Sequence, residues 1–264
     1  MKKHFLFAAL LVCAIGANAQ QAVVPQNREL ATPPAKKFDL YLLAGQSNMA
    51  GRGIPTPEDT IGDPRILLLN RNGQWEIAKA PVHFDKKAAG IGPGLSFARE
   101  MVKKDPTIVI GLIPCAAGGS SIEHWLNDEY WEQTRSYPWN NAVLRTRLAM
   151  KDGRLKGILW HQGESNSSPE KAAAYHSQLV QLVEKFRSTF QLPGLPFVAG
   201  ELPAFNKRAG NLNAALYDAA KQLQHFSVVS GAELTPNKDN LHINTASQHV
   251  FGKRYAEAME ALLK

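Results

Sequence analysis

Short apolar runs that alternate with segments of helical periodicity are the feature that most constrains the fold of this chain. The runs lie at 38–43, 66–69, 108–113, 157–160 and 197–200, with a weaker one at 226–229. Continuous apolar runs are typical of strands buried on both faces, and strands that alternate with helices form parallel sheets. The sequence therefore predicts an α/β fold in which helices cover both faces of a parallel sheet.

Two long helices are predicted from their apolar stripes. The first begins at a capping box made by Ser167 and Glu170, with Pro169 in the first turn. Its stripe consists of Tyr175, Leu179, Leu182, Val183, Phe186 and Phe190. The second helix ends the chain, and its apolar face consists of Val250, Phe251, Tyr255, Met259 and Leu262. Three long stretches outside the predicted strands and helices are irregular, at 51–64, 72–94 and 116–140. Irregular segments of this length are typical of coil that lines or covers a site.

Residues 1–19 have the features of a secretory signal. Lys2 and Lys3 precede an apolar stretch, and residues 17–19, Ala-Asn-Ala, have the small-x-small pattern of a cleavage site. We therefore expect an exported protein, periplasmic or extracellular, whose mature chain begins at Gln20. Lipidation at Cys13 is the alternative, but the preceding Val12 is larger than the small residue usually found there.

The rest of the chain is expected to form one domain. Removal of the signal leaves 264 − 19 = 245 residues, and we expect a flexible, proline-containing leader at 20–37 and a single domain at 38–264. No later segment approaches the roughly 18 consecutive apolar residues that span a bilayer, so no membrane association is expected after export. Nothing in the sequence specifies an oligomeric state.

Charge and cysteine content bear on the partners and the covalent links that the chain can have. The net charge is +7, and loss of Lys2 and Lys3 leaves +5, with no run of adjacent Lys or Arg longer than two. A nucleic-acid-binding protein concentrates its positive charge, so nucleic acid is not an expected partner. Only Cys115 remains after processing, which excludes an intramolecular disulfide and leaves a reactive thiol as a minor alternative.

Polar clusters follow several of the predicted strands. They occupy residues 45–48, 115–121 and 161–166, and a further cluster lies at 239–242 after the last strand. In open α/β sheets, ligands bind at the carboxyl ends of the strands. Taken alone, residues 45–48 fit a turn with a helix cap equally well. The joint placement of all the clusters favours one functional site at that edge.

These clusters contain the residue types of serine hydrolysis. A serine hydroxyl needs an imidazole to take its proton, and the imidazole needs an acid to fix its tautomer. Ser47, His242 and Asp239 can supply these groups, because an Asp three residues before a His can reach its Nδ1.

The oxyanion of the intermediate also needs hydrogen-bond donors. Three groups could serve: the Ser47 N–H, a backbone N–H at Gly118 or Gly119, and the side-chain amide of Gln162.

The motifs GQSNMAG, CAAGGSSIEHW, HQGESN and DNLH resemble, in order, the sequence blocks of the SGNH hydrolase superfamily. They are most similar to carbohydrate esterase family six and the sialate O-acetylesterase-like branch, and the resemblance covers nearly the whole mature chain. It implies a flavodoxin-like three-layer α/β/α sandwich. It also implies that Ser47 is the nucleophile, His242 the base and Asp239 its partner, with Gly119 and Gln162 in the oxyanion hole.

The chain departs from the superfamily pattern in its third block. The usual donor there is an Asn, and Gln162 stands in its place. Glu164, two residues further on, is a rival to Asp239 for the role of the acid.

Candidates for substrate binding lie near the same clusters. We predict this role for Gln46, Asn48, Arg52 and Trp125, with Glu123 and Glu201 as further wall residues; the alternative for the wall residues is surface or packing roles. Aromatic and amide side chains in 116–140 suit the stacking of sugar rings or the packing of the loop: Trp125, Asn127, Tyr130, Trp131, Tyr137 and Trp139.

The sequence therefore predicts an exported esterase, free of metal and cofactor, that removes O-acetyl groups from carbohydrate such as acetylated xylan or its oligosaccharides. A sialate or other acetyl-sugar esterase is the first alternative. A non-catalytic carbohydrate-binding protein and a lipase or thioesterase are weaker ones. His161 and Glu164 have no further ligands at metal spacing, so no zinc site is expected.

Overall fold

The central element is a sheet that confirms the predicted α/β class. The computed structural model describes residues 29–264, so the predicted signal, the Cys13 alternative and residues 20–28 lie outside the described part of the chain. The strands are β1 (Phe38–Gly45), β2 (Ile66–Leu69), β3 (Trp75–Ile77), β4 (Val109–Pro114), β5 (Arg154–His161), β6 (Phe197–Gly200) and β7 (Phe226–Val229). Their order is β3-β2-β4-β1-β5-β6-β7, and every neighbouring pair is parallel except β2 and β3.

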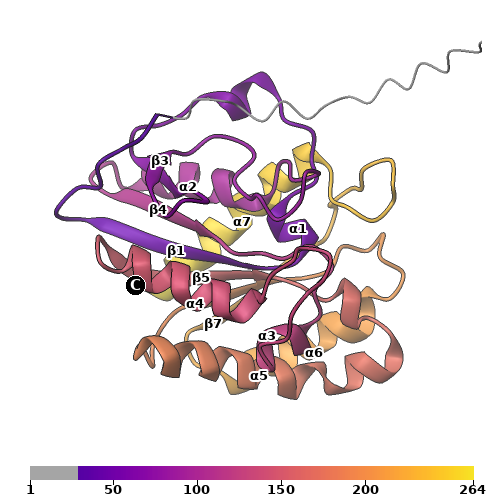
Figure 1. The fold of residues 1–264 in the computed structure, drawn as a ribbon. Coiled ribbons are helices and arrows are strands. Elements are labelled where there is room, and N and C mark those ends of the chain that lie inside the picture. Colours follow the sequence, from indigo (N-terminus) through magenta and orange to yellow (C-terminus); the bar gives the residue numbers. More distant parts are fainter. Residues whose placement is uncertain (1–28) are drawn as a thin grey trace, which may run out of the picture.

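Helices cover both faces of the sheet, which confirms the three-layer α/β/α sandwich (Figure 1). One layer contains α2 (Pro93–Lys104) and α7 (Thr245–Leu263), and the other contains α4 (Pro138–Ala149), α5 (Pro169–Phe190) and α6 (Ala209–Gln222). Strand β1 shows the physical reason, since successive side chains point to opposite faces. Leu40 and Leu42 pack in the core beneath α4 to α6, whereas Tyr41 and Leu43 pack beneath α2 and α7.

Short elements occupy the loops at the carboxyl ends of the strands. They are α1 (Ser47–Ala50), η1 (Pro57–Thr60), α3 (Ile122–Leu126) and η2 (Glu164–Asn166). Strands β4, β1 and β5 are adjacent in the sheet, so the loops that follow them meet at one edge. The loop between β7 and α7 lies beside α1 at this same edge (Figure 1).

Several local features differ from the expected pattern. Strand β3 lies within the stretch 72–94, which was expected to be irregular. Two residues of the expected leader, Glu29 and Ala31, make backbone hydrogen bonds to this strand. The N-cap of α5 is Ser168 rather than Ser167, because the Ser168 side chain accepts a hydrogen bond from the Lys171 N–H. In α7, Val250 is exposed, whereas the rest of the predicted face is buried or half-buried.

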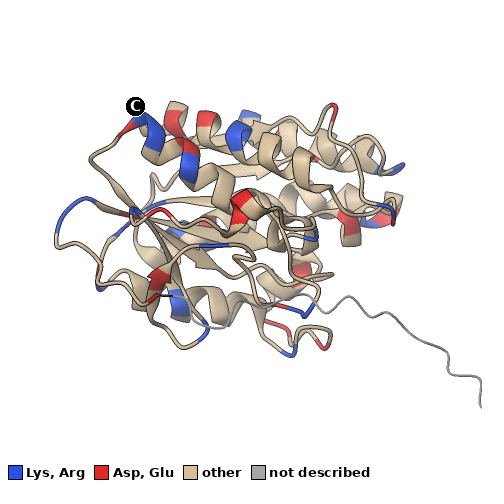
Figure 2. Ribbon diagram, turned by 90° about the horizontal axis from the view of Figure 1, so that it is seen from above, with Lys and Arg blue, Asp and Glu red and all other residues tan. Residues whose placement is uncertain are grey.

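Basic and acidic residues lie near one another on many helices and loops. Figure 2 shows Lys and Arg interspersed with Asp and Glu on the helices and loops. Among the helices of residues 29–264, none is long and apolar enough to cross a membrane.

Candidate active site

Strand β1 leads directly into the candidate nucleophile. Gly45 has a φ of +126°, and a Cβ at this position would lie 2.1 Å from the carbonyl oxygen of His161. Only glycine permits this close approach between the ends of β1 and β5. A hydrogen bond from the Gln46 N–H to the His161 carbonyl joins the two strand ends. Ser47 follows as the first residue of α1 and is 8% exposed. Within residues 29–264 its hydroxyl makes no hydrogen bond, so it remains available for chemistry.

Asp239 and His242 form a compact pair in the loop between β7 and α7. Asp239 Oδ2 lies 2.6 Å from His242 Nδ1, while Oδ1 accepts the N–H groups of Leu241 and His242 at 3.0 and 2.9 Å. Burial raises the pKa of Asp239, but the hydrogen bonds from the His242 backbone, its ring and the Leu241 N–H outweigh burial and lower it to about 2. The carboxylate therefore stays charged and holds Nδ1 as the protonated nitrogen, which leaves Nε2 as the proton acceptor.

Asn48 brings this pair beside Ser47. Its side-chain Oδ1 accepts the Ile243 N–H at 2.9 Å, and its Nδ2 lies 3.5 Å from the Leu241 carbonyl oxygen. These residues flank His242 on both sides, and Asn48 is the neighbour of Ser47 in the chain. The proposed nucleophile and base are thus joined through one side chain. The direct bond from Ser47 to the imidazole is absent among the described contacts, and such bonds are often long before substrate binds.

The backbone distinguishes Gly119 from Gly118 as an oxyanion donor. The Gly118 N–H donates to Asp85 Oδ2 at 2.9 Å and is therefore occupied. In the described part of the chain the N–H groups of Gly119 and Ser47 have no acceptor. Gly119 has a φ of +89°, a left-handed conformation that favours glycine. The available backbone donors are therefore those of Ser47 and Gly119.

The hydrogen bonds of Gln162 do not favour its predicted role as an oxyanion donor. It is fully buried, and its Nε2 lies 3.1 Å from Gln46 Oε1, 3.2 Å from the Ser120 carbonyl and 2.7 Å from Asn166 Oδ1. An amide nitrogen has two N–H groups, so these acceptors use its whole capacity. We assign Gln162 to the support of Gln46 and Asn166 rather than to the oxyanion.

We expect Gln162→Ala to lower the free energy of unfolding by about 2 kcal/mol, because buried acceptors would lose their donor. Urea unfolding of the variant and the parent protein would measure this change. A kcat that falls by roughly 10²- to 10³-fold with no loss of stability would contradict this assignment and return Gln162 to the oxyanion hole.

Two predicted substrate-binding residues, Trp125 and Arg52, make their side-chain contacts within the protein. Trp125 is fully buried, donates to Ser120 Oγ at 3.1 Å and packs edge-on against Trp160 at 5.2 Å between ring centroids. Arg52 forms a buried ion pair with Asp85 at 2.8 Å. Neither side chain is free to contact a sugar.

The other aromatic residues of the segment 116–140 differ in their exposure and contacts. Trp131 donates from Nε1 to the Gly118 carbonyl at 3.0 Å and is half-buried. Tyr130 and Tyr137 are 45% and 46% exposed and their ring centroids are 5.2 Å apart, whereas Trp139 is buried in the core. Sequence reasoning missed Asp85, which holds both Gly118 and Arg52, because nothing in its local sequence marks it.

The remaining wall candidates serve structural networks. Glu123 accepts hydrogen bonds from Asn166 and Gln178; burial raises its pKa, but the hydrogen bonds of its side chain and backbone outweigh this and lower it to about 2. Glu201 accepts the N–H of Gly231 at 2.8 Å.

Burial raises the pKa of Cys115 to about 11, which argues against a reactive thiol.

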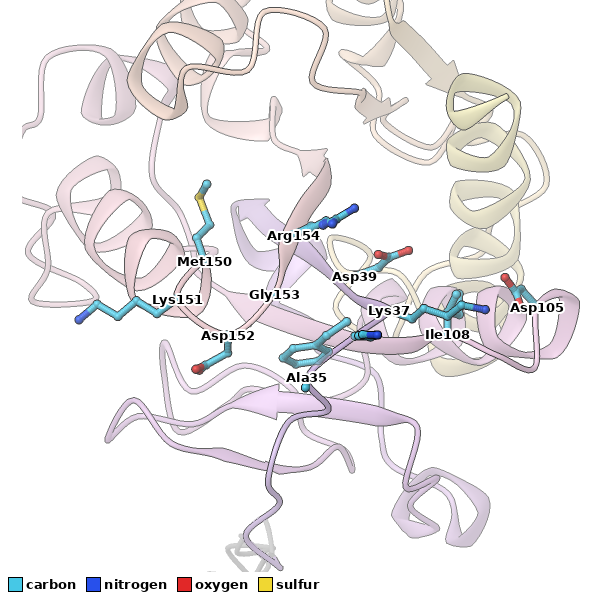
Figure 3. A pocket seen from close by; sticks show the side chains of 12 residues that line it. Ala35, Lys37, Asp39, Asp105, Ile108, Met150, Lys151, Asp152, Gly153 and Arg154 are labelled. Carbon is cyan, nitrogen blue, oxygen red and sulfur yellow. The ribbon is translucent and has the colours of Figure 1, made fainter.

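A cavity of about 570 Å³ lies at the opposite edge of the sheet, at the amino ends of β1 and β5 (Figure 3). Lys37, Asp39, Asp105 and Arg154 line it, and Ser47 lies beyond the other end of β1. This cavity is therefore separate from the candidate active site. Residues 29–264 contain no cluster of three or more side chains suited to hold a metal ion.

Known proteins match the chain over nearly its whole length. Residues 37–261 match the family described as carbohydrate esterase, sialic acid-specific acetylesterase. A probable carbohydrate esterase from Arabidopsis thaliana is 30% identical over 246 residues, which are 85% of this chain and 91% of that protein. An X-ray structure of the Arabidopsis thaliana protein matches with a TM-score of 0.77 at 30% identity, over 87% of this chain and 99% of that one.

More distant structures share the fold. NanS matches with a TM-score of 0.67 at 19% identity, over 88% of this chain and 98% of its own. A carbohydrate acetylesterase from Xanthomonas citri matches with a TM-score of 0.66 at 18% identity, over 85% of this chain and 56% of its own. The predicted SGNH hydrolase fold is thereby confirmed. The chain belongs to the sialic acid-specific acetylesterase family of carbohydrate esterases, which are carboxylic ester hydrolases.

Proposed function

We propose that the protein is an exported serine esterase that removes acetyl groups from acetylated xylan or its oligosaccharides. The observation that carries the catalytic part is the Asp239–His242 pair, which Asn48 holds beside Ser47. The unoccupied N–H groups of Ser47 and Gly119 supply the donors that ester hydrolysis requires.

The reaction follows from these groups. His242 Nε2 takes the proton from the Ser47 hydroxyl as Oγ attacks the acetyl carbonyl carbon, and the N–H groups of Ser47 and Gly119 stabilise the oxyanion. When the ester bond breaks, His242 returns the proton to the departing sugar oxygen. A water molecule, deprotonated by His242, then attacks the carbonyl carbon of the acetyl-Ser47 ester. As the bond to Ser47 Oγ breaks and acetate leaves, His242 returns the proton to Oγ and restores the Ser47 hydroxyl. Asp239 stabilises the imidazolium in both steps.

The preference for a neutral sugar rests on the state of Arg52. Sialic acid carries a carboxylate, and a site that recognises it would benefit from a free guanidinium. Arg52, the arginine that follows α1, is instead paired with Asp85, and Lys86 donates to Gln133 at 2.6 Å. The family description favours an acetylated sialic acid as the second candidate substrate.

Acetate release from acetylxylan, acetylated sialic acid and a long-chain ester, at matched ester concentrations, tests this proposal. We expect the highest kcat/KM on acetylxylan oligosaccharides, and a higher value on acetylated sialic acid would establish the second candidate. Export rests on the signal features of residues 1–19. N-terminal sequencing of the enzyme used in this assay is expected to begin at Gln20, and a chain that retains Met1 would contradict export.

A further inference from the structure

The segment that carries the acid and the base is internally braced. We name residues 237–243 the base loop. Its Asn237 N–H donates to the His242 carbonyl at 2.6 Å, and the Asn240 N–H donates to the Asn237 carbonyl at 3.0 Å. The contact between Asp239 and His242 also lies within this loop. The catalytic pair is therefore a unit, and its position relative to Ser47 depends on contacts from outside the loop.

Asn48 supplies contacts of this kind immediately beside the nucleophile. Its side chain bonds the backbone of Leu241 and Ile243, the two neighbours of His242. Its own main chain is held by α7, because Gln248 Nε2 donates to the Asn48 carbonyl at 3.0 Å. Asn48 is only 1% exposed, so the predicted role in substrate binding does not agree with its position.

Glu164 determines which way the Asn48 amide points. A carboxylate only accepts hydrogen bonds, and Glu164 Oε1 lies 2.5 Å from Asn48 Nδ2. The amide nitrogen must therefore face Glu164 and the Leu241 carbonyl, which leaves Oδ1 facing the Ile243 N–H. A reversed amide would set a nitrogen donor against the Ile243 N–H, and the base loop would lose this bond.

The surroundings of Glu164 argue that the carboxylate is not retained for stability. Its side chain is 9% exposed, and its Oε2 is buried without a hydrogen-bond partner. The nearest basic group is His161 Nδ1 at 3.9 Å, and burial lowers the pKa of His161, which favours the neutral ring. Burying a carboxylate with an unpaired oxygen costs free energy.

We propose that Asn48 and Glu164 are positioning residues: Glu164 orients the Asn48 amide, and Asn48 holds the base loop so that His242 faces Ser47. The inference rests on the proposed serine mechanism. It assigns to Glu164 a role different from that of an acid bonded directly to His242, because its closest hydrogen-bond partner is Asn48.

The first test is Asn48→Ala. A displacement of about 1 Å between reacting groups can lower a rate by about 10², so we expect a fall of that size in kcat with little change in KM. The rate at which an organophosphorus reagent labels Ser47 should fall in parallel, because labelling uses the same proton transfer to His242. A rise in KM with unchanged kcat and unchanged labelling would overturn the proposal and make Asn48 a substrate-binding residue.

Asn213→Ala is the matched control. The Asn213 amide also bonds a loop through both its groups, accepting from the Leu202 N–H and donating to the Leu202 carbonyl at 2.9 Å each. Its removal costs two hydrogen bonds to a loop backbone, as Asn48→Ala does at the base loop, but at a loop without proposed catalytic residues. We expect unchanged kcat and labelling, and a loss equal to that of Asn48→Ala would overturn the proposal by showing a general structural effect.

The decisive test exchanges the two partners. Asn48→Asp alone sets two carboxylates against each other and should lower kcat at least as much as Asn48→Ala. In the double variant Asn48→Asp, Glu164→Gln, the new glutamine can donate to the new aspartate, whose other oxygen still accepts the Ile243 N–H. We expect the double variant to exceed Asn48→Asp in kcat by at least about 10-fold, as a coupling between residues in direct contact. A double variant no better than the single one would overturn the proposal.

Two readouts separate this inference from the proposed function. Wild-type protein that is not labelled at Ser47 would refute the serine mechanism itself. Wild-type protein that is labelled, together with an Asn48→Ala variant labelled at the same rate, would refute only the positioning role. Thermal unfolding shows whether the Asn48→Ala variant folds. If it does not fold, Glu164→Gln is the test variant. Its unfolding temperature should be no lower than that of the parent protein, and its kcat should fall by about 10-fold, because a misoriented Asn48 amide no longer holds the base loop.

Discussion

Replacing Ser47 by alanine is expected to abolish acetate release while leaving the fold intact. Loss of the nucleophile lowers kcat by about 10⁶ in the well-studied serine protease case. The Ser47 hydroxyl makes no hydrogen bond within residues 29–264, so its removal leaves no buried group without a partner. Acetate release and thermal unfolding of Ser47→Ala, compared with the parent protein, measure the two effects.

The matching control is covalent labelling. An organophosphorus reagent should modify the parent protein at Ser47, as located by peptide mass spectrometry, and should leave Ser47→Ala unmodified. Retention of a tenth of the parent activity in the variant would rule out Ser47 as the nucleophile.

The second large effect is expected for Asp239→Asn. Asp239 uses Oδ1 for two backbone N–H groups and Oδ2 for the His242 ring. Asparagine has only one side-chain oxygen, so it must leave either the backbone or the ring without an acceptor. Loss of the acid also admits the wrong imidazole tautomer, which lowers kcat by about 10⁴ in the serine protease example. We expect a loss of this order at neutral pH.

The pKa of Asp239 predicts how its contribution to stability depends on pH. The folded pKa of Asp239, about 2, lies below the ordinary value of 3.8. The stability that this carboxylate contributes is therefore present above pH 3.8 and is lost as the pH falls through about 2. Between pH 4 and neutrality Asp239 remains ionised, so a loss of wild-type activity in that range would not report protonation of Asp239.

Asp105→Asn is a suitable comparison for Asp239→Asn. Asp105 also accepts from a backbone N–H two residues ahead, that of Thr107 at 2.8 Å, but it lies at the opposite edge of the sheet. It should retain full kcat. Glu164→Gln should lose less activity than Asp239→Asn, and the reverse order measured across pH would move the role of the acid to Glu164.

The sequence alone was sufficient to predict the fold class, six of the seven strands of residues 29–264 and the two longest helices. It also predicted that the polar clusters lie at the carboxyl ends of the strands. Apolar periodicity is a local property, and burial on two faces or on one stripe leaves its pattern in neighbouring residues. The pairing of Asp239 with His242 is local as well, because the two residues are three positions apart in one short loop. Strand β3 escaped prediction because three residues are too few to show a period.

Only the tertiary structure decided which candidate groups are free to act. Gly118 and Gly119 are adjacent and chemically identical, yet Asp85, distant in sequence, occupies the N–H of Gly118 alone. Gln162 fits the oxyanion motif, but its buried amide donates to acceptors in two other segments, Gln46 and Ser120, and to Asn166 in its own. The availability of a donor depends on acceptors that only folding brings near it, and no local pattern records them. The sequence therefore determined the chemistry present at the edge of the sheet, while long-range packing determined which of its atoms can reach a substrate.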